Sequence, residues 1–176
     1  ADPHSAGRLP WPLSLMGTTF DPHARKRASV YANDDFFCIE SCAGYRRVVD
    51  DRIVAFLPRE ASESDIGNAV LSALASYRVI PVVEHAEFFA TTRLETRHVE
   101  WEQELNARAG YKSTRSLYRG LKLVPVQLSE SGLTVSSTVK DRKRGFEGNG
   151  FSLTVEANLG AAVVGNAVKK ALTECA

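Results

Sequence analysis

The sequence has no apolar stretch long enough to cross a membrane, and it has only three cysteines. Its longest apolar runs, such as residues 53–57 and 161–164, fall far short of the roughly 18 residues that a membrane-spanning helix requires. Cys38, Cys42 and Cys175 are odd in number, in a chain large enough to fold without disulfides. We therefore expect a protein that is not integral to a membrane and that works in the reducing cytoplasm.

The sequence also lacks the spacings that mark metal sites. Cys38 and Cys42 are separated by three residues, but no second pair of cysteines or histidines follows at a ligand spacing. Small buried thiols are therefore a better interpretation than a structural zinc, which stays open as an alternative. We expect neither a metal nor a cofactor.

Motifs that would carry catalysis are missing as well. The signatures of serine hydrolases, zinc proteases, P-loop proteins and dinucleotide-binding enzymes are absent. The glycine-rich segment 145–150 precedes a predicted strand and lacks a phosphate-binding lysine, so we interpret it as a loop. His98 could act as a base because imidazole titrates near neutrality, but a lone histidine on an amphipathic helix is more often a boundary residue. The sequence therefore favours a protein that is not an enzyme.

An excess of positive charge is also lacking. The formal net charge of the chain is +1 at pH 7. A protein that binds nucleic acid through nonspecific phosphate contacts is normally much more basic. The overall charge therefore gives no support to a general nucleic-acid-binding protein.

The first 29 residues differ in composition from the rest of the chain. Prolines at positions 3, 10, 12 and 22 interrupt any helix, and a basic run at 25–27 ends the segment. We interpret residues 1–29 as a flexible tail and residues 30–176 as a single domain, an ordinary size for one. Met16 is the single methionine, so one hypothesis places the natural start there, with residues 1–15 added for expression.

An internal repeat organises the domain. Residues 66–74 recur in part as residues 164–172, at a constant offset of 98 residues. In both copies the apolar residues fall at the spacing i, i+3, i+4, i+7 and i+8, which predicts two amphipathic helices with Leu74 and Leu172 buried.

Other residues predict how these two helices begin and pack. Ser62 with an acid three residues later predicts a capping box at the first helix, and Asn158 is the expected N-cap of the second. Gly67 and Gly165 each weaken a helix by about 1 kcal/mol relative to alanine. Their presence in both copies therefore indicates close packing of each helix against a sheet.

Strand-forming segments precede each predicted helix. We expect strands at residues 36–40, 45–49, 52–57, 121–128, 133–138 and 151–155. Asp50 and Asp51 are expected to form one tight hairpin turn, and residues 129–132 another. Because hairpin-linked strands are antiparallel, each copy becomes a β-meander covered by one helix.

Between the two copies, residues 84–120 are expected to form a helical insert. One helical face carries Leu94, His98, Trp101 and Leu105, and Gly110 supplies the stop; a shorter helix follows from about residue 113 to 120. The predicted fold class is therefore α+β. Two pseudo-repeated antiparallel β-meander plus helix units share one core, with the insert between them.

Charge is segregated along the domain. Acidic residues outnumber basic ones at 30–65 and 84–104, whereas residues 108–122 carry basic residues and tyrosines without an acid. A further basic segment lies at 140–144. A charge run is usually a solvated surface, but opposed acidic and basic segments also suit electrostatic docking of a charged protein partner.

Four segments together resemble the CdiI proteins, the immunity partners of contact-dependent growth inhibition toxins. They are residues 30–37, 43–51, 62–74 and 110–118, and the resemblance spans about residues 30–175. It implies a protein of the bacterial cytoplasm that binds the C-terminal toxin domain of a cognate CdiA protein, often a nuclease, and blocks it without catalysing a reaction. The repeated strands-then-helix layout also resembles the Whirly fold of single-strand DNA binders.

Two surfaces are candidates for partner binding. A nuclease toxin needs a basic surface for phosphate, so an inhibitor that covers it should present carboxylates. The acidic candidates are Asp34, Asp35, Asp50, Asp51, Glu95, Glu100, Glu102 and Glu104. The alternative is a single-stranded nucleic-acid-binding module that would use Tyr111, Lys112, Arg115, Tyr118 and Arg119 to stack bases and contact phosphates. A third interpretation is an enzyme centred on His98 and the nearby acids.

Overall fold

A computed structural model describes residues 25–44, 48–141, 145–156 and 160–176, and of residues 48–52 it describes the backbone alone. The elements within these ranges are, in chain order, β1 (Lys26–Ala32), β2 (Phe36–Gly44), β3 (Val48–Pro58), α1 (Glu63–Ala75), β4 (Arg78–Val79), η2 (Val82–Glu84), α2 (His85–Phe88), α3 (Thr91–Ala109), α4 (Thr114–Tyr118), β5 (Lys122–Ser129), β6 (Gly132–Asp141), β7 (Gly145–Val155) and α5 (Ala161–Thr173).

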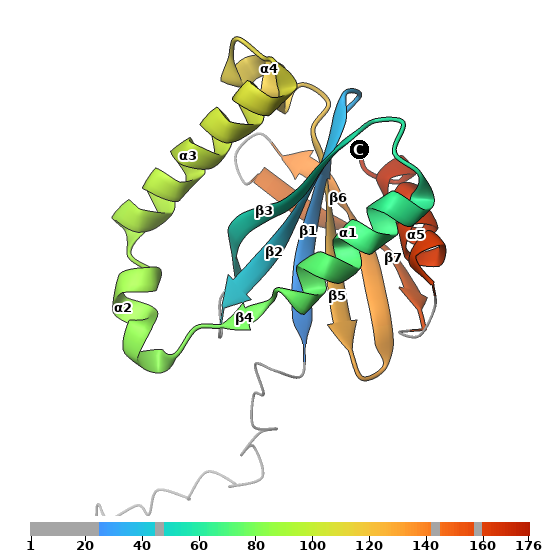
Figure 1. Ribbon diagram of the computed structural model, residues 1–176, viewed down its shortest axis with the longest axis horizontal. Coiled ribbons are helices and arrows are strands. Elements are labelled where there is room, and N and C mark those ends of the chain that lie inside the picture. The colour runs from blue at the N-terminus through green and yellow to red at the C-terminus, as the bar shows by residue number, and fades with distance from the viewer. Residues whose placement is uncertain (1–24, 45–47, 142–144, 157–159) are drawn as a thin grey trace, which may run out of the picture.

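The strands of the described ranges form one seven-stranded sheet (Figure 1). Six of them lie in the order β3-β2-β1-β5-β6-β7, and every neighbouring pair on this path is antiparallel. The short β4 pairs in parallel with the end of β2. An antiparallel sheet combined with separate helices confirms the predicted α+β class.

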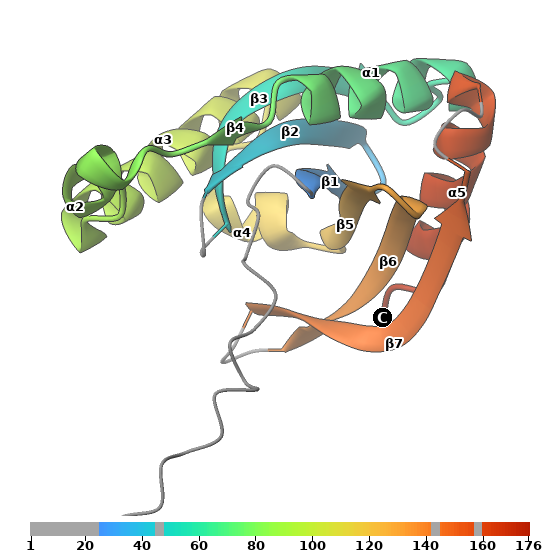
Figure 2. The same cartoon turned by 90° about the horizontal axis from the view of Figure 1, so that it is seen from below.

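Helices cover the two faces of the sheet unequally (Figure 2). The apolar stripes of α1 and α5 pack on one face, and Leu74 and Leu172 are buried there as predicted, with 1% and 5% of their surface exposed. On the opposite face, α3 and α4 bring Leu105 and Leu117 against Phe36 of β2. The fully buried sheet residues of this second cluster, Phe36 and Cys38, belong to β2, and Phe146 of β7 packs against its edge. The cluster positions the helical insert.

The two repeat helices touch where each carries its glycine. A Cβ atom on Gly67 would lie 1.8 Å from the carbonyl oxygen of Ala161, and one on Gly165 would lie 1.9 Å from that of Glu63. Since Ala161 and Glu63 begin α5 and α1, each helix starts against the glycine of the other. The expectation that these glycines pack against the sheet was wrong. They allow close contact between two helices, which a side chain would block.

The ends of the helices follow local sequence chemistry. Ser62 and Asp65 form the predicted capping box at α1, in which each side chain accepts from the other residue's backbone N–H. Gly110 ends α3 in the left-handed conformation, with φ of 70°, as its position predicts. The N-cap of α5 is Gly160, so the assignment of this role to Asn158, which lies outside the described residues, was wrong.

Three boundaries of the first unit differ from the prediction. Asp50 and Asp51 lie inside β3, where Asp50 pairs with Cys42, so they do not form the hairpin turn. β3 is an edge strand with a register shift beside Cys42, and such strands accept charged residues that central strands exclude. The expected strands 45–49 and 52–57 are therefore one strand from Val48 onward. The missed strand β1 begins at Lys26, so the sheet includes residues that were assigned to the tail. In the second unit, β7 begins at Gly145, so the interpretation of residues 145–150 as a loop was also wrong.

The bounds of the elements follow the 98-residue offset seen in the sequence. Shifting α1 by 98 residues gives the bounds of α5, and the three strands before each helix then coincide to within two residues at every end. β1 and β5, which pair at the centre of the sheet, join the two halves.

Candidate functional site

The turn between β1 and β2 presents two carboxylates to solvent. The side-chain oxygen of Asn33 accepts from the backbone N–H of Asp35 at 2.9 Å and of Phe36 at 3.2 Å. This is the arrangement by which asparagine stabilises a turn through its own side chain. Asp34 and Asp35 are exposed beyond the strand ends, while Asn33 itself is buried. A fixed backbone therefore holds two exposed acids at one end of the sheet.

The helical insert contacts this same turn through Tyr111. The Asn33 amide donates to the Tyr111 hydroxyl at 3.0 Å, and that hydroxyl donates to the Asp35 carboxylate. Burial, followed by the hydrogen bond to Asp35, raises the pKa of Tyr111 above its ordinary value of 10.0. Asp35 is therefore committed to an internal contact, whereas no such contact is found for Asp34 among the described residues.

The other acidic candidates are dispersed. Asp50 and Asp51 lie in β3, and their side chains are outside what the structure describes. The remaining four lie on α3, where Glu95, Glu100 and Glu104 are exposed and Glu102 is half-buried. The structure therefore does not bring all eight acids together on one surface.

Three of the four acids of α3 have partners on the insert. Glu100 pairs with Arg97 at 3.1 Å, and Glu104 pairs with Arg108 at 2.6 Å. Exposed pairs of this kind contribute at most about 1 kcal/mol, so a partner protein could displace them. Glu102 instead accepts from the Tyr118 hydroxyl at 2.8 Å, which helps to hold α4 against α3.

The two tyrosines of the alternative nucleic-acid surface pack inside the insert. Tyr111 lies beside Phe36, and Tyr118 lies beside Trp101 with the ammonium of Lys140 at 4.8 Å from its ring centre. Bases could stack on these rings only after displacing the internal contacts. The basic candidates near them, Lys112, Arg115 and Arg119, are all exposed. The geometry therefore supplies phosphate-attracting charge there but no open aromatic platform.

His98 lies at the edge of the insert. Its Nε2 atom is 3.3 Å from a carboxylate oxygen of Glu102 and 3.3 Å from the Tyr118 hydroxyl oxygen. Its ring stacks on Trp101, with centroids 5.8 Å apart, and 60% of the side chain is exposed. This environment agrees with the interpretation of His98 as a boundary residue.

A buried carboxylate fixes the insert to the sheet. Glu40 is 1% exposed on β2, where it accepts from the indole N–H of Trp101 on α3 and from the thiol of Cys38. Sequence reasoning missed this contact. The available signal was an acid two residues beyond Cys38 and four beyond Phe36, on the same apolar strand face.

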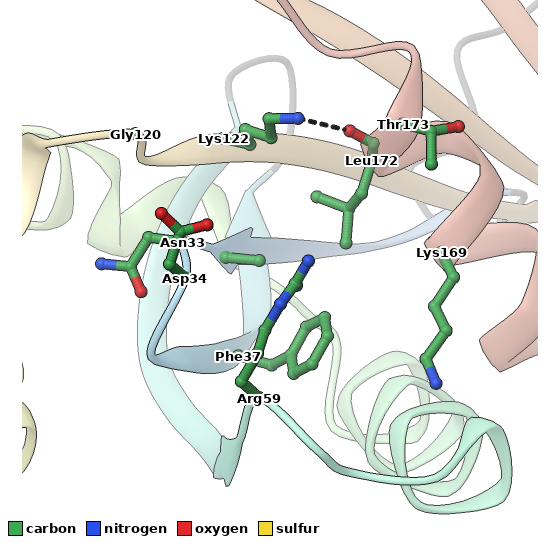
Figure 3. A pocket seen from close by; sticks show the side chains of 10 residues that line it. Asn33, Asp34, Phe37, Arg59, Gly120, Lys122, Lys169, Leu172 and Thr173 are labelled. Atoms are coloured by element: carbon green, nitrogen blue, oxygen red, sulfur yellow. Dashed lines mark hydrogen bonds between the residues drawn. The ribbon is translucent and has the colours of Figure 1, made fainter.

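A cleft of about 390 Å³ opens between the β1–β2 turn, the end of β3, the start of β5 and the C-terminal turn of α5 (Figure 3). Its charged lining residues are Asp34, Arg59, Lys122 and Lys169. Arg59 and Lys169 were not recognised as site residues in the sequence, and Lys122 was noted only as the last member of the basic segment 108–122. The three cations lie in separate segments of the chain and share no common pattern, so the fold alone brings them together.

Clustered metal ligands and long apolar helices are missing from the part of the chain that the structure describes. No group of three or more histidine, cysteine or acidic residues that could hold a metal ion occurs there. No helix of the same residues is long and apolar enough to cross a membrane. Cys38, Cys42 and Cys175 are all buried, in agreement with their interpretation as buried thiols.

The family of CDI immunity proteins, CdiI, matches residues 26–175. The chain belongs to this family. It is also similar to the immunity protein CdiI-YPIII of Yersinia pseudotuberculosis serotype O:3 (strain YPIII), with 26% identity over 166 residues that cover 84% of this chain and 94% of the relative.

Solved structures share the fold of this CdiI chain. A Neisseria meningitidis protein of unknown function matches with a TM-score of 0.82 and 24% identity, over 90% of this chain and all of that one. A chain from a CdiA-CT/CdiI toxin and immunity complex of Yersinia pseudotuberculosis matches with a TM-score of 0.78 and 22% identity, over 86% of this chain and 98% of that one. At these identities the likeness establishes the fold.

Proposed function

We propose that this CdiI protein binds the C-terminal toxin domain of a cognate CdiA protein in the cytoplasm and neutralises it. The observation that carries the proposal is the family match over residues 26–175, which includes the whole described sheet and both repeat helices. The similarity to a chain of a solved toxin and immunity complex supports it further. Neutralisation acts by covering a surface of the toxin, and no catalytic step by this chain is required.

The toxin is a nuclease in this proposal, and the β1–β2 turn is the part of the surface that meets it. A nuclease carries positive charge where it holds phosphate, and exposed carboxylates attract and orient such a surface. Asp34 supports this assignment best, because it is exposed and has no internal partner among the described residues. The acids of α3 form a second candidate surface, on which Glu95 lacks an ion pair with any described residue.

The two halves of the chain are structural repeats in this proposal, with a layout like that of the Whirly fold. The reciprocal contacts of Gly67 and Gly165 and the shared 98-residue offset support it. The two features assigned to toxin binding lie in or directly after the first repeat. The acidic turn joins β1 to β2, and the helical insert follows α1.

Co-expression tests the function. Cells that make the toxin domain encoded beside this gene should grow when this protein is present, and a stoichiometric complex should survive gel filtration. A noncognate immunity protein expressed at the same level is the control. Continued killing with this protein in excess, together with the absence of a complex, would contradict the proposal.

A charge reversal tests the surface. We expect Asp34→Lys to slow association and to raise the dissociation constant for the toxin domain by about tenfold at low salt, with a smaller effect at high salt. Glu130→Lys is the matched control, because Glu130 is an exposed acid at the corresponding turn of the second half. Asp35 is left intact, since reversing it would also break the contact with Tyr111. Equal affinity of Asp34→Lys and Glu130→Lys for the toxin domain would contradict this assignment and favour α3 as the interface.

A further inference from the structure

The cleft beside the acidic turn carries more positive than negative charge. Arg59, Lys122 and Lys169 line it, against the single carboxylate of Asp34 (Figure 3). Lys122 is partly satisfied, since its ammonium donates to the carbonyl oxygen of Leu172 at 2.9 Å, near the C-terminus of α5. Within the described part of the chain, no ion pair joins Arg59 or Lys169 to a carboxylate. The cleft therefore holds two cations that are available to a ligand.

Arg59 packs against an aromatic ring at the edge of the cleft. Its guanidinium carbon lies 5.0 Å from the centre of the Phe37 ring, and Phe37 is 1% exposed. A buried aromatic ring restricts the plane of the guanidinium by cation–π contact and leaves its N–H groups free to donate. Such a preorganised fork matches the two oxygens of a carboxylate or of a phosphate.

We propose that this cleft receives a carboxylate side chain of the toxin domain. The inference rests on the proposed function, because Asp34 is both a wall of the cleft and the acid assigned to the interface. The interface then uses both signs of charge side by side: the turn meets a basic group of the toxin, and the cleft behind it takes an acidic one. Adjacent opposite charges fix one orientation of a partner, which a purely acidic surface would not.

Neutral substitutions test the cleft. The variants are Arg59→Gln and Lys169→Gln, with Lys170→Gln as the matched control, because Lys170 is the exposed neighbour on α5 and does not line the cleft. We expect Arg59→Gln to raise the dissociation constant for the purified toxin domain about tenfold, Lys169→Gln to raise it less, and Lys170→Gln to leave it unchanged. Urea denaturation verifies that all three fold like the wild type. Unchanged affinity of both cleft variants would overturn the proposal.

Inorganic phosphate serves as a probe of the cleft in the protein without toxin. Phosphate titrated by NMR at low ionic strength should shift the Arg59 side-chain signal, with binding weakened about threefold to fivefold by Arg59→Gln and strengthened by Asp34→Asn. Phosphate binding could follow this pattern while Arg59→Gln leaves the affinity for the toxin domain unchanged. In that case the cleft binds only free anions, and the proposal fails. If wild-type protein does not bind the toxin, the proposed function fails with it. If the wild type binds the toxin domain tightly and both Arg59→Gln and Lys169→Gln bind it equally well, only the cleft assignment fails.

Discussion

The sheet face that the helical insert contacts is aromatic in the first half of the sheet (β1 to β3) and lined by hydroxyl groups in the second half (β5 to β7). In the first half it carries Phe36 and Phe56, whose rings stack with centroids 4.8 Å apart beneath the helical insert. Positions 98 residues later hold Thr134 and Thr154, whose hydroxyl oxygens lie 3.3 Å apart. The four residues thus form an aromatic pair in one half and a hydroxyl pair in the other.

This difference explains where the insert sits. An aromatic sheet face must be removed from water, and α3 and α4 do this by packing Leu105 and Leu117 against it. A face of threonine and serine hydroxyls is compatible with solvent, and Thr134 and Thr154 remain half-buried and exposed, respectively. The insert is therefore a cover that the first half requires and the second does not.

The largest effect should come from removing an aromatic ring under the insert. We expect Phe36→Ala to lower the free energy of unfolding by about 3–5 kcal/mol, because the ring is fully enclosed and leaves a cavity. Thr134→Ala at the corresponding position should change it by no more than about 0.5 kcal/mol. Urea denaturation of both variants measures the difference. Similar losses at the two positions would break the comparison.

On the opposite sheet face the two halves should behave alike. We expect Leu74→Ala and Leu172→Ala each to cost about 2–5 kcal/mol, since both side chains are buried in the shared core. Val163→Ala on α5, where 39% of the residue is exposed, is the control and should cost clearly less. Calorimetric or denaturant unfolding of the three variants decides the matter. Two near-silent leucine variants would mean that the helical repeat is wrongly interpreted.

The contact between α1 and α5 should give a smaller loss of stability, equal in the two helices. Alanine is the better helix former, yet Gly67→Ala and Gly165→Ala should each destabilise by about 1–3 kcal/mol, because the added methyl group meets a backbone carbonyl. Asn68→Ala, at an exposed position one residue along α1, should be neutral or slightly stabilising. Thermal unfolding distinguishes these outcomes. A stabilising effect of both glycine substitutions would contradict the close approach of α1 and α5.

The smallest expected effect is on the pH dependence of the unfolding free energy, through Tyr118 of the helical insert. Burial, followed by the hydrogen bond to Glu102, raises the pKa of Tyr118 well above 10.0. The unfolded chain loses this proton near pH 10, so the stability contributed by Tyr118 is full below that pH and is lost as the pH rises through the folded pKa. Tyr118→Phe should therefore make the decline in unfolding free energy above pH 10 less steep. Tyr77 and Tyr111, which are shifted in the same direction, will maintain part of the decline.

Features of the fold that depend on residues close together in the sequence were predicted, whereas those that depend on distant residues were not. The helices of the repeat, the capping box and the stop at Gly110 follow from spacing within a few residues, and all three were predicted. β1 was missed because its first residues, Lys26 and Arg27, belong to the basic run 25–27 that was assigned to the end of the tail. Its place at the centre of the sheet comes from pairing with β2 and β5, which sequence pattern does not show.

The candidate site was predictable only in part, for the same reason. Asp34 and Asp35 stood out because they are adjacent acids before a predicted strand. Arg59, Lys122 and Lys169 come from three distant segments, and nothing in their sequence neighbourhoods links them. The Glu40 contact with Trp101 spans 61 residues of sequence and depends on which face of β2 the insert covers. Such long-range sets become visible only in the folded chain.

The pairing of β1 with β5 also has a consequence for how the protein is made. Residues at Lys26–Ala32 find their partners only at Lys122–Ser129, after most of the chain has left the ribosome. Until then the newly made first half presents β1 as an open edge, the kind of template on which strands of other molecules can add. Contacts of such long sequence separation also slow folding. We expect the nascent first half to depend on chaperones, and the protein to become competent for its task only once its second half is complete.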